Sequence, residues 1–388
     1  MKTINRWVKT SIIYIFPVFA LVLSLYAKET SRAARNALYL CLDVVIPSLF
    51  PFFVLSRLMV PYLSDLSCPA FLKRIAEKFF GLPYYTLITI LIGYLSGYPT
   101  GAKLARDMLD EGLIDSRQAS KMITVANNCS PLFIIGTIGA GLYKSVRIGF
   151  FLLLIHWIAG LLSAFIIGQC FGRGESQLQR VRLKKTESKP AGGFSLPQLF
   201  PSAIEDAAIL CIKVSGYIVF FAVLSELLDL LGLFAFLGSI PGLFKAAASS
   251  NTGISAVISA FLRGVMEITS GSQAITRLAD SGLTLKLALI SFICGFAGFS
   301  VHTQVMGIMK GSGAKYRVFL TGKLLHGSFA GIITYATMSY APLTISTSAV
   351  EEVQPIGLSL VRLITLGIII LSLVFAPHRP VKSQYKNR

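Results

Sequence analysis

The sequence predicts an all-α polytopic membrane protein, with about eight transmembrane helices and two re-entrant or broken hairpin segments in two inverted-topology repeats. Three observations carry this prediction: an apolar composition, apolar runs of membrane-spanning length, and an internal repeat. Of the 388 residues, 54% are hydrophobic and 14% are charged, and the mean hydropathy is +0.69. Soluble domains carry about 25% charged residues. A soluble fold therefore could not cover this much apolar surface.

Apolar runs of sufficient length mark the expected spans, because crossing a hydrocarbon core of about 30 Å takes roughly 20 helical residues. Full spans are expected near 10–27, 38–60, 84–100, 147–171, 204–231, 252–268, 318–340 and 356–376. The runs 122–142 and 287–309 are interrupted by Gly, Pro, Asn or Ser, and are expected to be re-entrant or broken. The first apolar run is long for a signal peptide, so we expect it to be retained as a span.

An internal repeat relates the two halves of the chain. A shift of 170 residues superposes Cys41 on Cys211, Gly101 on Gly271, Ser130 on Ser300, Arg147 on Arg317 and His156 on His326. One constant offset over so long a stretch is hard to attribute to chance. Each unit is expected to cross the membrane an odd number of times, which places the second unit upside down relative to the first.

The repeat and the charge pattern together divide the chain. The expected segments are an N-terminal span and connector (1–35), a first gate-like repeat (36–171), a basic linker (172–198), a second, inverted gate-like repeat (199–341), and a last span with a basic tail (342–388). The basic residues cluster at the ends of apolar runs, as in cytoplasmic loops. The linker and both termini are therefore expected in the cytoplasm, and 341–355 on the opposite side.

The net charge of +18 raises the question of charged partners. Nucleic acid is not expected, since the basic residues are not interleaved with aromatic residues on one surface. The basic linker is instead expected to contact anionic lipid, at about 1 kcal/mol for each basic residue near the surface. Nothing in the sequence indicates an oligomeric state.

The first half contains two candidate site segments. Gly97, Pro99 and Gly101 end one apolar run, and Asn127, Asn128, Ser130 and Pro131 open another. Proline suits the first turn of a helix, so the polar residues are expected at a half-helix N-terminus. Such an end offers unpaired N–H groups to a carboxylate. A packing kink is the alternative, but interrupted segments in repeat-equivalent positions favour a substrate site.

The second half contains the corresponding segments, 267–273 and 295–304. The candidate substrate-binding residues are Thr269, Ser270, Gln273, Ser300, His302 and Gln304, and Gly271 and Gly298 are the structural glycines. Small-residue helix packing is the alternative for the glycines. Arg263 is a further substrate-binding candidate and Glu267 a candidate for carrying a coupling proton. Because they lie four residues apart, they could also neutralise each other.

Other charged residues in the apolar regions have plainer expectations. Lys323, His326 and His156 are expected near span ends, where long side chains reach the membrane surface. Lys213 lies inside an expected span, with Asp43 at the repeat-equivalent position. Residues 103–121 are expected to form a solvated amphipathic helix.

The sequence contains no motif that indicates an enzyme. There is no GxSxG, HExxH or Walker motif and no paired-carboxylate arrangement. The six cysteines include no CxxC pair, so neither a metal site nor a disulfide framework is indicated. We expect no enzyme activity, catalytic residue, metal or cofactor.

The first-half motifs also carry a family resemblance. Gly97-Tyr98-Pro99-Thr100-Gly101-Ala102-Lys103, followed by Asn127 and by Ser130-Pro131-Leu132-Phe133-Ile134, resembles the sporulation integral membrane protein YlbJ family, which belongs to the nucleoside-recognition, or gate-domain, superfamily. Gly298-Phe299-Ser300-Val301-His302-Thr303-Gln304 is also similar to the family's pattern, whereas the segment Asn128-Cys129-Ser130 departs from it. The resemblance covers roughly spans two through eight.

The resemblance implies a function in endospore formation, namely transport of dipicolinic acid from the mother cell toward the forespore. It also implies a location in the cell membrane or outer forespore membrane, with other sporulation membrane proteins as candidate partners. Dipicolinate needs positive potential for two carboxylates and an aromatic or apolar slot, for which Phe133 and Phe299 are candidates. Related gate-domain transporters carry nucleosides, and composition does not distinguish the two substrates. A nucleoside or other small-solute transporter, and a non-transporting sporulation scaffold, are the alternatives.

Overall fold

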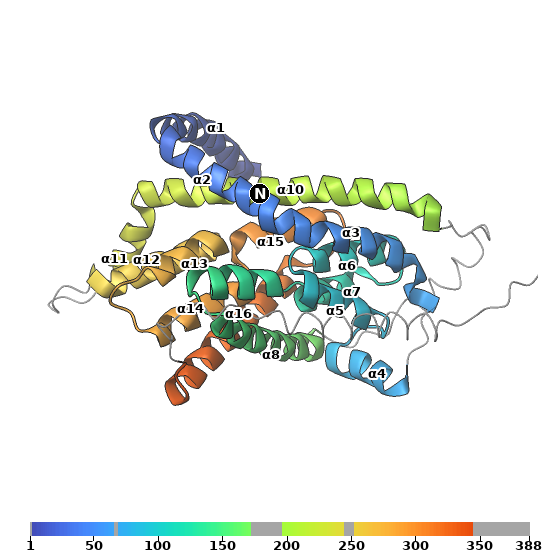
Figure 1. The fold of residues 1–388 in the computed structure, drawn as a ribbon. Coiled ribbons are helices and arrows are strands. Elements are labelled where there is room, and N and C mark those ends of the chain that lie inside the picture. Colours follow the sequence, from blue (N-terminus) through green and yellow to red (C-terminus); the bar gives the residue numbers. More distant parts are fainter. Residues whose placement is uncertain (1, 66–68, 172–195, 244–251, 344–388) are drawn as a thin grey trace, which may run out of the picture. The chain divides into compact units, whose positions relative to one another are not determined.

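The computed structural model describes residues 2–65, 69–171, 196–243 and 252–343. Nearly all of the predicted basic linker lies outside the described residues, as do most of the loop 341–355, the expected last span and the basic tail. The described part of the chain contains helices and no strands, which confirms the predicted all-α class (Figure 1).

The first half of the chain begins with a long N-terminal helix. Its elements are α1 (Lys2–Leu25), α2 (Ala27–Leu40), η1 (Cys41–Val45), α3 (Ile46–Met59), η2 (Val60–Asp65), α4 (Ala70–Ile75), η3 (Ala76–Phe80), α5 (Thr86–Ser96), α6 (Thr100–Asp110), α7 (Ser116–Val125), η4 (Leu132–Leu142) and α8 (Val146–Cys170). The second region contains α10 (Leu196–Leu230), α11 (Leu233–Leu243), α12 (Thr252–Met266), α13 (Ile268–Thr276), α14 (Leu283–Phe296), α15 (Gly298–Ile308) and α16 (Tyr316–Tyr340).

Helix length and composition agree with a multi-pass membrane protein. Four described helical stretches are long and apolar enough to cross a membrane: Ala27–Leu63, Val146–Cys170, Gln198–Leu230 and Leu283–Ile308. Shorter apolar helices cover Phe16–Leu25, Thr86–Ser96, Leu132–Leu142 and Gly253–Met266.

Two of the expected full spans are instead half-length helices. The region expected to span at 84–100 contains α5, which has 11 residues, and that at 252–268 contains α12, which has 15. At 1.5 Å per residue these helices extend for about 17 and 23 Å, less than a hydrocarbon core of about 30 Å. Each is followed, after a break, by a second short helix, α6 or α13. The interruptions expected at 122–142 and 287–309 are present as well, so each repeat contains two breaks.

The helix bounds follow the 170-residue offset of the sequence repeat. α8 and α16 each have 25 residues, and both their first and their last residues differ by this offset. The repeat-equivalent His156 and His326 contact each other, with ring centroids 4.4 Å apart. This contact lies where α8 packs against α16.

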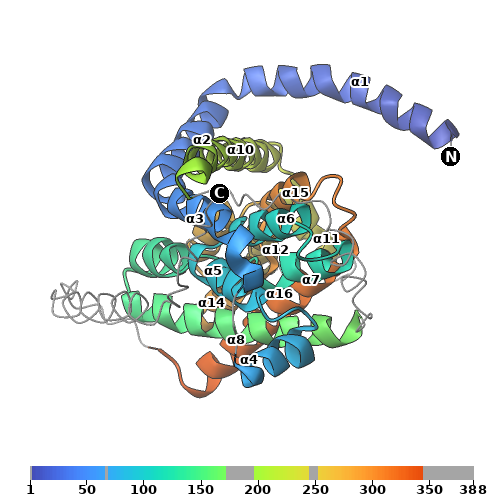
Figure 2. The same cartoon turned by 90° about the vertical axis from the view of Figure 1, so that its right-hand side faces the viewer.

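Two long helical arms, also repeat-equivalent, pack against each other. Figures 1 and 2 show α10 alongside α2 and α3. The contact between the arms is apolar and includes Leu49 and Phe53 of α3 and Ala203, Ala207 and Leu210 of α10. A larger core gathers residues from both repeats, among them Ile90, Met122, Ile290 and Phe319.

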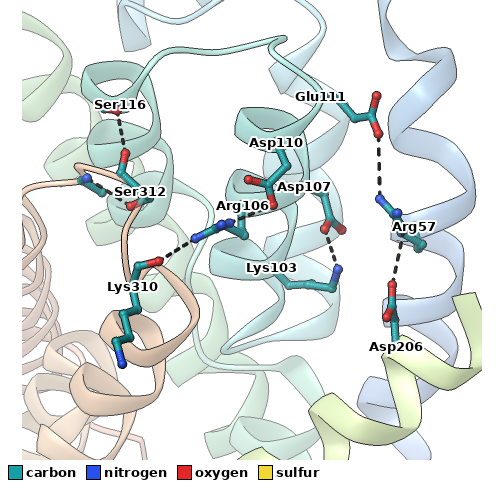
Figure 3. A network of polar contacts seen from close by, with 11 residues as sticks. Arg57, Lys103, Arg106, Asp107, Asp110, Glu111, Ser116, Asp206, Lys310 and Ser312 are labelled. Atoms are coloured by element: carbon teal, nitrogen blue, oxygen red, sulfur yellow. Dashed lines mark hydrogen bonds and ion pairs between the residues drawn. The ribbon is translucent and has the colours of Figure 1, made fainter. Parts of the chain in front are cut away.

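A charged network surrounds α6 (Figure 3). Its ion pairs are Arg57–Glu111 at 4.0 Å, Arg57–Asp206 at 3.4 Å, Lys103–Asp107 at 2.5 Å and Arg106–Asp110 at 2.8 Å. Arg106 also donates to the Lys310 carbonyl at 2.7 Å, and Ser116 Oγ donates to the Ser312 carbonyl at 2.6 Å. The network therefore joins the first repeat to the second.

Residues 103–121 differ from the expected solvated helix. They form α6 and most of α7, and Asp107 and Lys121 are buried. Burial raises the pKa of the Asp107 carboxyl above its ordinary value, although the neighbouring Lys103 acts in the opposite direction. Lys121 Nζ donates to the Gly81 and Gly168 carbonyls at 3.4 and 3.3 Å. Tertiary packing buries these charges, and their partners are Lys103 of the same helix for Asp107 and the two backbone carbonyls for Lys121.

Candidate functional site

A cavity lies where the broken helices meet. Its empty volume is about 690 Å³, open mouth included. The polar lining residues are Ser48, Ser96, Tyr98, Ser130, Glu267, Thr269, Ser300 and Gln304. The remaining lining residues are Leu40, Val44, Val45, Leu49, Cys129, Phe133, Val214, Ile218, Ile268 and Val301.

The first break, between α5 and α6, depends on glycine. Gly97 has φ +89°, a backbone conformation that L side chains rarely adopt. A Cβ atom on Gly97 would lie 2.6 Å from Ser130 Cβ, and one on Gly101 would lie 2.3 Å from the Ala126 carbonyl oxygen. Pro99 completes the turn before α6. The glycines therefore let the first break lie directly against the second.

The second break is the non-helical segment 126–130, between α7 and η4. Asn127 Oδ1 accepts from the Ala102 N–H at 3.3 Å, and Asn128 Nδ2 donates to the Val125 carbonyl at 2.9 Å. The Cys129 N–H donates to His156 Nε2 at 3.0 Å. Both asparagines are buried and absent from the cavity lining. They hold the freed backbone, while Ser130 lines the cavity and accepts from the Phe133 N–H at 3.2 Å.

The third break, between α12 and α13, is capped by Glu267. Its two carboxylate oxygens accept from the Thr269 and Ser270 N–H groups at 2.8 and 2.7 Å. A protein carboxylate thus already occupies the N-terminus of α13, where the sequence suggested that a substrate carboxylate could bind. Both Glu267 and Thr269 line the cavity.

Arg263 does not pair with Glu267. Its guanidinium donates to Asp229 Oδ2 and Glu226 Oε2 of α10, each at 2.5 Å. Arg263 is also absent from the cavity lining. The mutual neutralisation considered from the four-residue spacing is wrong, because α10 supplies two carboxylates on the other side of the arginine.

The fourth break separates α14 from α15 at Ala297, which has φ +80° and is followed by Gly298 with φ +62°. The N-terminus of α15 has no side-chain cap. Ser300 and Gln304 line the cavity from its first turns, with Gln304 Nε2 donating to Ser300 Oγ at 3.3 Å. His302 lies behind them: its Nε2 is 2.9 Å from the Phe296 carbonyl and its Nδ1 is 3.1 Å from Tyr316 Oη.

The cavity thus brings together part of the predicted set. Ser130, Glu267, Thr269, Ser300 and Gln304 line it, as does Phe133. The other predicted residues lie elsewhere: Asn127, Asn128, Arg263, Ser270, Gln273, His302 and Phe299. Gln273 and Phe299 are exposed, and Ser270 Oγ lies 3.3 Å from Ser225 Oγ.

Sequence reasoning did not single out several lining residues. Tyr98 lies within the quoted glycine motif and could have been identified from its position there. Leu40, Val45, Val214 and Ile218 come from the two arms, whose continuous apolar sequence carries no signal of a site. Asp43 and Lys213, on the same arms, are exposed and absent from the lining.

Three titratable residues expected near the membrane surface are instead buried. Lys323, His156 and His326 are 0%, 2% and 2% exposed. Lys323 Nζ donates to the Asn127 carbonyl, and His326 Nε2 faces the His156 carbonyl at 2.9 Å. The snorkelling prediction is wrong because α8 and α16 pack against each other and against the second break. In the part of the chain that the structure describes, no group of three His, Cys, Asp or Glu residues could hold a metal ion.

Comparison with known proteins identifies a sporulation protein as a relative. The sporulation integral membrane protein YlbJ of Bacillus subtilis (strain 168) is 28% identical over 333 residues, which cover 82% of this chain and 79% of that protein. No family model matches the chain, and no solved structure matches it.

Proposed function

The chain belongs to the family of the sporulation integral membrane protein YlbJ, and we propose that it transports a small organic anion during spore formation, with dipicolinic acid as the favoured substrate. The observation that carries the proposal is the cavity at the four helix breaks, with Ser130, Thr269, Ser300 and Gln304 in its wall. Broken helices that meet at one cavity are the usual construction of a transporter substrate site.

The N-terminus of α15 is the place in this cavity best suited to a carboxylate. Its backbone N–H groups have no side-chain cap, and its dipole favours negative charge. Ser300 and Gln304 add a hydroxyl and an amide on the same helix. A carboxylate bound there needs no full counter-charge in the wall itself.

An aromatic ring would fit the apolar part of the wall. Val45 and Leu49 come from the first arm, Val214 and Ile218 from the second, and Phe133 from η4. Flat ligands are commonly held between such surfaces, with a few polar groups fixing their orientation. A pyridine dicarboxylate presents this combination of ring and charge.

Glu267 supports a second candidate, a nucleoside. Its carboxylate lines the cavity, and a negative charge there opposes a dianion but can accept hydrogen bonds from ribose hydroxyls. The two N–H groups bonded to Glu267 and the dipole of α13 reduce the repulsion between this carboxylate and an anionic substrate. A neutral solute is therefore the alternative that the geometry favours.

We further propose a transporter and not an enzyme, located in the cell membrane or outer forespore membrane with both termini in the cytoplasm. Cysteine-accessibility labelling from each side tests this topology. Labelling of 172–198 and 341–355 from the same side would contradict the inverted repeats. Anionic lipid at the basic linker and other sporulation membrane proteins are the proposed partners.

Reconstituted vesicles test the function. Purified full-length protein should give saturable uptake of dipicolinate that exceeds uptake of a simple dicarboxylate or a nucleoside. Selective nucleoside uptake would replace the proposed substrate by the alternative. No selective uptake of any of the three would favour a sporulation scaffold, for which the basic linker would be the docking surface.

A further inference from the structure

We infer that Lys323 provides the positive charge that attracts a carboxylate into the cavity, an inference that rests on the proposed transport of an anion. Arg263, the cation that the sequence suggested, cannot provide this charge because it is paired with Glu226 and Asp229. Glu267 adds a negative charge to the wall. Lys323 lies in α16, outside every sequence motif.

The contacts of Lys323 place its ammonium group directly behind the cavity wall. Its Nζ atom donates to the Asn127 carbonyl and lies 5.8 Å from the centroid of the Tyr98 ring. Tyr98 lines the cavity, and so do Cys129 and Ser130, which follow Asn127 in the second break. The ammonium therefore lies beside the wall residue Tyr98 and bonds the same break that supplies Cys129 and Ser130 to the wall.

Lys323 has no negative partner among the described residues. Its hydrogen bond goes to a neutral carbonyl, and no ion pair forms with it. The charged and titratable groups around it are His156, His302, His326 and Cys129. His156 Nε2 accepts from the Cys129 N–H, so this ring is not a cation.

This arrangement favours an anion in the cavity. Buried charges in proteins are normally paired with an opposite charge. Attraction between charges is strong where water is excluded and falls slowly with distance there. A substrate carboxylate beside Tyr98 and Ser130 would supply the missing partner. Because Lys323 also bonds the Asn127 carbonyl, the same charge holds the second break, which shapes the wall.

The test compares two ligands of one shape. Dipicolinate and its neutral analogue pyridine-2,6-dicarboxamide are titrated against full-length protein, as wild type and as Lys323→Gln. The substitution should weaken dipicolinate binding about tenfold or more, as loss of a nearby low-dielectric charge predicts. Binding of the diamide should change less than about twofold.

Lys121→Gln is the matched control. Lys121 is also buried and bonded to backbone carbonyls, but it does not line the cavity. It should leave the ratio of the two affinities unchanged. Equal weakening of both ligands in Lys323→Gln would show a purely structural lysine, and unchanged dipicolinate binding would also overturn the inference.

A measurement on the wild type keeps the inference testable if Lys323→Gln does not fold. A buried charge is poorly screened by salt, so the preference for dipicolinate over the diamide should change little between low and high ionic strength. A preference that disappears with salt would assign the attraction to surface charges instead. If the wild type binds neither ligand, the proposed function itself fails.

Discussion

The second and fourth helix breaks occupy corresponding places in the two repeats but are built differently. The second break leaves 126–130 without helix, and side chains from other helices bond its backbone. His156 Nε2 accepts a hydrogen bond from the Cys129 N–H, and Lys323 Nζ donates one to the Asn127 carbonyl. The fourth break is only a left-handed turn at Ala297 and Gly298. His302 Nε2 lies at the Phe296 carbonyl and Tyr98 Oη donates to the Cys294 carbonyl, while Gly295 packs closely against Gly327.

The difference shows two ways of interrupting a helix inside a membrane. Freed backbone groups must find partners where water is excluded. A long interruption frees several groups and therefore needs polar side chains from neighbouring helices. A short one frees few groups, so two side-chain hydrogen bonds and close packing of glycines are sufficient. Buried polar residues consequently gather around the second break, and the uncapped helix end at the fourth break stays available to a ligand.

Closing the space beside the breaks should have the largest effect. In Gly101→Val, the new Cβ atom would meet the Ala126 carbonyl oxygen at 2.3 Å, and in Gly295→Val it would meet Gly327 Cα at 2.8 Å. Backbone cannot yield cheaply, so each change should cost about 3 kcal/mol or more. Thermal unfolding in detergent and the yield of folded protein measure this.

Gly216→Ala is the control, because no atom lies within 4 Å of a Cβ built there. It should be neutral or slightly stabilising, as expected for a glycine within a helix. Wild-type stability of Gly101→Val would show that the first and second breaks are not in close contact.

Removing a histidine partner should distinguish the two breaks. His156→Leu leaves the buried Cys129 N–H without its acceptor, and should cost about 2–3 kcal/mol of unfolding free energy. His302→Leu affects the Phe296 carbonyl and Tyr316 at the fourth break, and should cost about 1–2 kcal/mol. Denaturant unfolding measures both. Equal losses would contradict the distinction between a polar break and a packed one.

Gln304→Leu tests the ligand side of the fourth break. The amide lines the cavity and bonds Ser300 Oγ. Its loss should raise the dipicolinate Kd about tenfold, because bonds to charged groups are worth about 1.5–3 kcal/mol. Isothermal titration at matched amounts of folded protein measures this. Little change in unfolding temperature is expected, since the substitution removes no backbone partner.

Substitution of the repeat-equivalent serines Ser130 and Ser300 should have the smallest effects. One substitution should affect stability and the other ligand binding. Ser300→Ala should weaken dipicolinate binding by about 1 kcal/mol. Ser130→Ala removes an acceptor from the Phe133 N–H and should reduce stability by about 1 kcal/mol, as for a lost helix cap. Unchanged transport in both Ser300→Ala and Gln304→Leu, at wild-type protein levels, would place the site elsewhere.

Local sequence was sufficient to locate the second and fourth interruptions, and it marked the first and third as ends of apolar runs. Glycine and proline at Gly97, Pro99 and Gly298, and the polar run after Ala126, disfavour continuous helix wherever they stand. Such signals act within a few residues, so they could be recognised without knowing what lies nearby. The constant offset between the halves also links Ser130 to Ser300, since it depends only on the order of residues along the chain.

Other features depended on contacts between distant segments. The packing of α2, α3 and α10 decides which residues of the apolar arms line the cavity. It also brings Glu226 and Asp229 to Arg263. Half-length helices at 86–96 and 252–266 looked like ends of full spans, because apolar composition does not show where a chain turns back.

The sequence by itself determined the membrane class, the repeat and the positions at which helices break, because hydropathy and backbone preference are local properties of the chain. Only the tertiary structure decided that Lys323 and the two central histidines are buried and that Glu267 caps α13. The physical reason is that the environment of a charge is set by the helices around it. The residues that surround a charge can lie far away along the chain: Lys323 and Asn127, which share a hydrogen bond, are 196 residues apart.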